Sequence, residues 1–203
     1  MGQITATFTN TVSTNMINST SAVSYAAAHA GAGLSVNNFA NVAGGGFRHS
    51  LSGPNYVIDR YFFHFDTSSI PENATIVSAF LRILGSNTSS ANADSDGITL
   101  VASTVTSDTT LATSDWANIG ATQFITALTF ASFNTTGNND LTLNASGLAA
   151  IVLNAHSKFA IITSRDLSSS APTGLNNQTF DQSGTLLSVT YSVPDASGDF
   201  KFI

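Results

Sequence analysis

The sequence predicts an all-β fold: a two-sheet antiparallel β-sandwich, jelly-roll-like, with one short helix. Three observations predict it. Apolar and polar residues alternate in about eight separate segments, which is the pattern of half-buried strands. Turn-forming pairs such as Gly53-Pro54 and Ala171-Pro172 separate these segments. The length of 203 residues suits one undivided sandwich.

The predicted strands follow the chain in order. The strongest is the aromatic and β-branched run YVIDRYFFHF at 56–65. In the segment 75–84, alternate residues place Ala79, Leu81 and Ile83 on one face and Phe80 and Arg82 on the other. The segments expected to be strands are 4–8, 56–65, 75–84, 98–105, 123–130, 139–143, 159–163 and 186–193.

The remaining segments predict one helix and several loops. Helix formers occupy 144–153, and Asn144 or Ser146 at its start can cap the first turn. The stretch 86–97 is rich in Ser, Thr, Asn and Asp, so we expect a long exposed loop there. The region 11–55 is rich in Ala, Asn and Gly and weakly patterned, and one short strand and an irregular arm are expected in it.

We interpret the chain as a single domain. Residues 1–54 are expected to form an N-terminal arm and the first strand or strands of that domain, and residues 55–194 the sandwich. Residues 195–203 are expected to form a C-terminal tail containing Phe200, Phe202 and Ile203. Apolar residues are unusual in such a tail, because free ends are normally polar. We therefore predict that these three side chains are assembly contacts against this domain or a neighbouring subunit.

The composition favours an extracellular or particle protein. Only 9% of the residues are charged, against about 25% in an ordinary soluble domain. The six basic residues are scattered, which argues against nucleic-acid binding. No apolar run approaches the roughly 20 residues that a membrane span needs, so no membrane insertion is expected. Cys is absent and residues 1–8 lack the features of a secretion signal, which fits a virion or extracellular localisation.

Two consecutive segments carry a resemblance to a known family. Residues 60–71 read RYFFHFDTSSIP and residues 74–83 read ATIVSAFLRI. This pattern resembles the DNRLRE-type β-sandwich domains of bacterial extracellular proteins, and a related uncharacterised group in phage and metagenomic structural proteins. The second group is also similar around 138–151, 157–160 and 186–191, so the resemblance covers roughly 55–193. It implies a sandwich fold, and polysaccharide binding by some members of the wider family implies a glycan as an alternative partner.

One loop has the ligand types of a calcium site. Asn92, Asp94 and Asp96 alternate before Gly97, as oxygen ligands do in many calcium loops. Asp94 and Asp96 are therefore the metal candidates, with calcium as the only cofactor considered. The alternative, which we favour, is a solvated turn, because the bidentate Glu of an EF-hand is missing. The run Asn138-Asn139-Asp140 is a weaker second candidate.

The residues that enzymes use are not arranged in a catalytic pattern. The four His residues have no metal-binding spacing, no G-x-S-x-G motif occurs, and Glu72 is the single Glu. No enzymatic activity and no catalytic residue are therefore expected, although a pocket with convergent carboxylates would favour an enzyme. The single Trp, Trp116, is expected in the core rather than as a sugar-stacking platform.

These observations favour a non-enzymatic structural component of a phage or virus-like particle, such as a decoration, fibre or tail protein. Its partners would be further copies of itself or other particle subunits. The alternative is a carbohydrate-binding or adhesive module of an extracellular surface protein, which would bind a cell-surface glycan.

Overall fold

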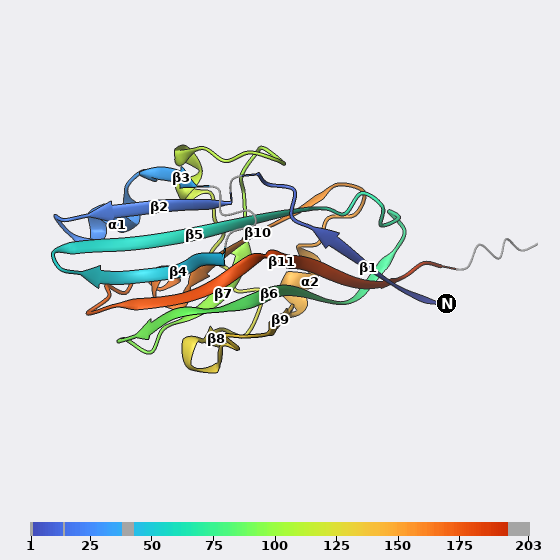
Figure 1. The fold of residues 1–203 in the computed structure, drawn as a ribbon. Helices are drawn as coiled ribbons and strands as arrows, with labels where there is room; N and C mark the ends of the chain where they lie inside the picture. Colours follow the sequence, from blue (N-terminus) through green and yellow to red (C-terminus); the bar gives the residue numbers. More distant parts are fainter. Residues whose placement is uncertain (1, 14, 38–42, 195–203) are drawn as a thin grey trace, which may run out of the picture.

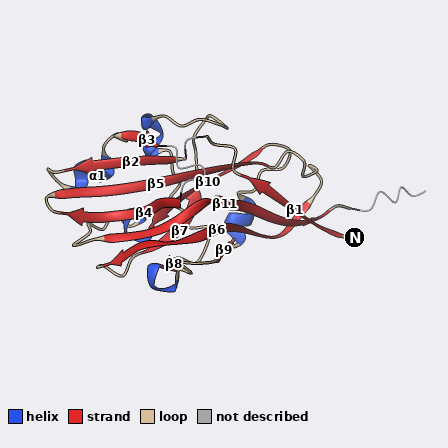
Figure 2. Ribbon diagram, in the orientation of Figure 1, coloured by secondary structure: helices blue, strands red, loops and turns tan. Residues whose placement is uncertain are grey.

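The computed structural model describes residues 2–13, 15–37 and 43–194, and these form an all-β fold of antiparallel strands (Figure 1). Short helices lie outside the sheets (Figure 2). The strands are β1 (Gln3–Thr9), β2 (Met16–Ser21), β3 (Ser35–Asn37), β4 (Ala43–Ser52), β5 (Asn55–Asp66), β6 (Thr75–Asn92), β7 (Gly97–Ala102), β8 (Leu128–Thr129), β9 (Asn138–Thr142), β10 (His156–Thr163) and β11 (Asn176–Ser192). The helices are α1 (Tyr25–Ala30), α2 (Ala145–Ala149) and α3 (Ser164–Leu167), with 3-10 turns η1 (Thr113–Ala117) and η2 (Phe130–Ser132).

The strands form two layers that are joined along one side. One layer contains β9, β6, β11 and β1, and the other contains β8, β7, β10, β5, β2 and β3. Strand β4 belongs to both, because residues 43–48 pair with β11 and residues 49–52 pair with β5. The resulting sheet runs from β8 to β9 and nearly closes into a barrel. The predicted all-β class is confirmed, with the two sheets linked rather than separate.

The main core lies between the two layers. It is formed by alternate side chains of the strands, among them Leu81 from β6, Phe63 from β5 and Val189 from β11, each fully buried. The rings of Phe47 and Phe180 stack with centroids 4.1 Å apart at the corner where β4 joins β11. Since the chain has no Cys, no disulfide bond contributes, and burial of the apolar side chains of this core is the main source of stability.

A second, smaller core covers the outer side of β5. It contains Ile58 and Phe62 from β5, together with Trp116 from η1 and Ala28 from α1. Strand β5 is therefore buried on both faces, which explains why its sequence is almost continuously apolar and aromatic. Tyr61 and Phe63 face the main core, whereas Phe62 faces the second core.

Several strand predictions had wrong boundaries, and the region 11–55, where one short strand and an irregular arm were expected, contains β2, β3 and β4. The predicted loop 86–97 is wrong over its first half, because β6 continues to Asn92 and pairs there with the start of β11. Strand β11 in turn begins at Asn176 rather than near residue 186. These stretches are mostly polar, so they lack the apolar alternation that marks a strand, and backbone pairing together with the buried Phe180 extends them. The predicted strand 123–130 is reduced to Leu128–Thr129, because the consecutive side chains Phe124 and Ile125 both lie in the main core, whereas neighbours in a strand point to opposite faces.

The helix count was also wrong, since the structure has three short α-helices instead of one. The helix predicted over 144–153 exists only as the shorter α2, and the Asn144 side chain caps it by accepting a hydrogen bond from the Gly147 N–H at 3.0 Å. Helix α1 has six residues and α3 has four, too few for a periodic pattern. Ser24 caps α1 and Thr163 caps α3. No helix among the described residues is long and apolar enough to cross a membrane.

The core predicts the cost of removing a side chain. We expect Leu81→Ala to lower the free energy of unfolding by about 2–5 kcal/mol, because Leu81 is fully buried between the sheets. The matched control is Leu34→Ala, where the side chain is 67% exposed and the expected change is within about 0.5 kcal/mol. Urea unfolding measures both, and equal effects would contradict this placement of the core.

Candidate functional site

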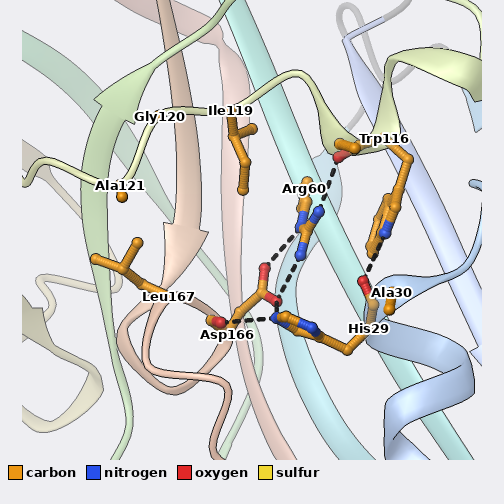
Figure 3. A pocket seen from close by; sticks show the side chains of 10 residues that line it. His29, Ala30, Arg60, Trp116, Ile119, Gly120, Ala121, Asp166 and Leu167 are labelled. Atoms are coloured by element: carbon orange, nitrogen blue, oxygen red, sulfur yellow. Dashed lines mark hydrogen bonds and ion pairs between the residues drawn. The ribbon is translucent and has the colours of Figure 1, made fainter.

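The candidate site is a pocket of about 300 Å³ on the outer side of β5 (Figure 3). Its polar wall consists of Arg60, Asp166, His29 and Trp116, and the rest of its lining is mainly small or apolar. These four residues come from β5, α3, α1 and η1. The pocket is thus the place where four segments far apart in the sequence meet.

Local structure places each charged side chain in the pocket. Arg60 lies on the same side of β5 as Phe62, because side chains alternate along a strand. Thr163 caps the single turn of α3 by accepting a hydrogen bond from the Asp166 N–H at 3.2 Å, which turns the Asp166 carboxylate toward Arg60. His29 sits in the last turn of α1.

The guanidinium of Arg60 is held on three sides. Its Nε and Nη2 donate to the two carboxylate oxygens of Asp166 at 2.8 and 2.9 Å, and Nη1 donates to the Trp116 carbonyl at 2.8 Å. The guanidinium carbon also lies 4.0 Å from the centre of the Trp116 ring. Arg60 is 4% exposed and Asp166 is 1% exposed, so this is a buried, bidentate ion pair with a cation–π contact.

His29 completes the cluster on the other side of Asp166. Its Nε2 lies 3.0 Å from the Asp166 carbonyl oxygen and 3.2 Å from the carboxylate, so this nitrogen carries a proton and donates it. Hydrogen bonding to the Asp166 carboxylate raises the pKa of His29. Burial would raise the pKa of Asp166, but the hydrogen bonds from Arg60 and His29 outweigh it and lower that pKa to about 2. Asp166 is therefore ionised at neutral pH.

A second polar group lies behind the pocket. The Tyr25 hydroxyl is 3.3 Å from His49 Nε2, and His49 Nδ1 is 3.7 Å from Asp96 Oδ2. His49 and Asp96 are buried, and neither His49 Nδ1 nor Asp96 Oδ2 has a hydrogen bond within the described residues. The order hydroxyl, imidazole, carboxylate is that of a catalytic triad.

The proton affinities in this group do not suit catalysis. Burial, reinforced by the charge of Asp166, raises the pKa of Tyr25 well above its ordinary value. Burial lowers the pKa of His49 to about 4. A proton on Tyr25 would therefore have to move to a much weaker base, whereas a catalytic base works best with a pKa near the working pH. The pocket itself has a single carboxylate, Asp166, which Arg60 neutralises.

The two calcium candidates lie in different environments. Asp94 accepts hydrogen bonds from the Thr173 N–H at 2.9 Å and from Asn176 Nδ2 at 2.6 Å. Burial opposes ionisation of Asp94, but these bonds lower its pKa to about 2. Asp96 is buried and accepts from the Gly97 N–H, and burial raises its pKa. No group of three His, Asp or Glu side chains suited to a metal occurs in the described part of the chain, and calcium binding stays a prediction.

The other singled-out residues are dispersed. Trp116 is 1% exposed, as expected for a core residue, and its indole N–H donates to the His29 carbonyl at 2.9 Å. His64 is fully buried and contacts the Ser103 hydroxyl at 3.2 Å. Asp140 forms an ion pair with Arg82 at the surface. Phe200, Phe202 and Ile203 lie outside the described residues.

The sequence did not predict the cluster around Arg60. Its members are 31 to 137 positions apart in the chain, and His29 and Asp166 lie in helices that were not expected. One signal was available: a basic residue in the middle of the apolar run 56–65 requires a buried acidic partner.

Comparison of the chain with protein-family models and with curated proteins finds no match. The resemblance of residues 55–193 to DNRLRE-type domains therefore stays an expectation drawn from the residues.

The buried ion pair predicts an asymmetric response to charge removal. We expect Asp166→Asn to lower the free energy of unfolding by about 3–5 kcal/mol, because Arg60 is left buried without a counter-charge. The matched control is Asp140→Asn, which breaks the exposed pair with Arg82 and is expected to cost about 0–1 kcal/mol. Chemical denaturation of both variants tests the difference, and a small effect at Asp166 would argue against a buried pair.

His49 predicts a specific pH dependence. Its pKa is about 4 in the folded protein and about 6.5 when unfolded, so the unfolded chain binds more protons between these values. As pH falls from 6.5 to 4, the free energy of unfolding of the wild type should decrease by up to about 1.4 kcal/mol per pH unit relative to that of His49→Gln. Urea unfolding across this range measures the difference. His156→Gln, at a partly exposed position, serves as the control substitution, and parallel curves for wild type and His49→Gln would refute the assignment.

Proposed function

We propose that this protein is a non-enzymatic structural component of a particle, such as a decoration, fibre or tail protein of a phage or virus-like particle. It acts through contacts of its β-sheets with other copies of itself or with other particle subunits. This role places it in the virion or outside the cell. The proposal needs no cofactor and no catalytic residue.

The observation that carries the proposal is the uncovered edge of β1. This strand pairs only with β11 among the described residues, and its other edge has no partner strand there. Its sequence, QITATFT, contains no charge and no proline, and most of its side chains are exposed. Monomeric proteins usually protect such edges with charges, prolines or bulges. An unprotected β1 edge favours pairing with another chain.

The outer face of the same sheet supports the proposal. Cross-strand rows on this face carry mostly hydroxyl side chains, for example Thr5 beside Thr190 and Ser78, and Thr7 beside Ser188. Thr5 and Thr190 hydroxyls lie 2.9 Å apart. Phe80 and the Arg82–Asp140 ion pair lie further along this face, so it is the part nearest β1 that is uncharged and can lie against a neighbour with little cost from desolvating charges.

The pocket and the aliphatic character of the exposed apolar side chains favour this role over the alternatives. The ionisable groups at the pocket, Arg60, Asp166 and His29, bind one another, as groups that stabilise a fold do. A carbohydrate-binding module usually presents aromatic rings to the sugar. The largest exposed apolar side chains of the described residues are aliphatic, for example Ile4, Val77 and Leu175, and Trp116 is buried. An adhesive or glycan-binding role is therefore the less favoured reading.

The test is the assembly state of the full chain. We expect the wild type to form oligomers. In Thr5→Lys/Thr7→Lys the ratio of monomer to oligomer should rise at least about tenfold, because two charges would block the β1 edge. Thr109→Lys/Thr122→Lys, at exposed loop positions, adds the same charge and should leave assembly unchanged. Analytical ultracentrifugation measures the distribution. A wild type that stays monomeric at all concentrations would refute the proposal.

A further inference from the structure

A groove of about 700 Å³ lies where the sheet fails to close into a barrel. One wall is β9 with the residues that follow it, and the other wall is the segment leading into β8, with Ser132 of η2 and Asn134. Strands β8 and β9 are the two ends of the long strand order. One additional strand in this groove would complete the barrel.

The backbone of β9 is open toward the groove. In its antiparallel pairing with β6, the Gly85 N–H donates to the Gly137 carbonyl and the Leu143 N–H to the Ala79 carbonyl. Odd-numbered residues of β9 therefore direct their backbone groups to β6, and even-numbered residues direct theirs to the groove. The groups facing the groove belong to residues 138, 140 and 142. The apolar part of its lining consists of the buried Leu141 and Leu143 and the partly exposed Ala127 and Leu128.

Residues 199–203, DFKFI, have the sequence of a strand suited to this groove. Phe200 and Phe202 would lie on one face and Lys201 on the other, because strand side chains alternate. The two rings can join Leu141 and Leu143 on the core side. Lys201 would then face outward on the side of Asp140, where it would share that carboxylate with Arg82.

Within one chain, even a fully extended connection would not bring Phe200 to the middle of the groove. Ser192 pairs with Thr75 of β6, whereas β9 pairs with residues 80–84, so β11 runs past β9 and leaves at the far end (Figure 1). From Pro194 back to the groove is about 25 Å, from strand rise and strand spacing. The six residues from Pro194 to Phe200 span at most about 21 Å even when fully extended.

We propose that residues 199–203 of one copy add as a strand to β9 of a neighbouring copy, filling the groove between β8 and β9. This inference rests on the proposed function and identifies one contact through which copies of the protein would assemble. The link is head-to-tail, so it generates a ring or a filament. It uses backbone hydrogen bonds to the free edge of β9 and apolar contact of the two Phe rings for affinity.

Cysteine trapping tests this link directly, because the chain has no Cys of its own. Full-length Lys201→Cys is mixed with full-length Asn138→Cys or Thr142→Cys under mild oxidation. Both groove positions are used because the register along β9 is not fixed in advance. We expect disulfide-linked pairs at least about tenfold above those formed with the exposed control Thr122→Cys. Adding Phe200→Ser/Phe202→Ser to the Lys201→Cys chain should reduce trapping at least about tenfold, since the apolar anchors are lost.

The outcomes separate this inference from the proposed function. Trapping at the level of Thr122→Cys, or trapping unaffected by loss of the two Phe rings, would overturn the link. Trapping within a single chain carrying Lys201→Cys and Asn138→Cys, at high dilution, would overturn a contact between copies. If the wild type still assembles in either case, the structural role stands and another contact, such as the β1 edge, builds the particle.

Discussion

The burial of β5 on both faces is the constraint on which the rest of the structure depends. A strand in the middle of a sandwich needs cover on one side from the opposite sheet, and β5 obtains it from β4, β6 and β11. The other side is covered by α1, η1 and α3, which are too short to be stable alone. The guanidinium of Arg60 holds α3 through Asp166 and η1 through the Trp116 carbonyl. Helix α1 is held through the contact of His29 with Asp166. The ion pair thus fixes the layer that makes β5 an interior strand.

This arrangement divides the polar groups of the molecule into two classes. Several of the few charged residues are inside, where Arg60, Asp166, Asp59 and Asp96 are almost fully buried. Outside, the sheet faces consist largely of hydroxyl and amide side chains. A protein with 9% charged residues that places part of them in its interior leaves a surface with weak electrostatic steering. Such a surface favours association by shape and backbone pairing over association by charge.

The sequence predicted the parts of the fold that alternation encodes. Strands β1, β5, β9 and β10, the first half of β6 and the cap at Asn144 follow directly from local pattern. The polar half of β11 could not be predicted, because Asn176 and Gln178 are buried only through pairing with strands distant in the sequence. The site was missed for the same reason. Arg60 signalled a buried partner, but no local pattern identifies Asp166 or His29 as that partner.

The pairing of β1 with β11 has a mechanical consequence. Gln3 lies opposite Ser192, so both strands have their outer ends on the same side of the molecule (Figure 1). Tension applied through these two ends would open the ribbon one hydrogen bond at a time, because the bonds are perpendicular to the strands. Tension along a strand seated beside β9 would instead strain all of its bonds together. The geometry of attachment, more than the number of bonds, would set the force that the protein resists.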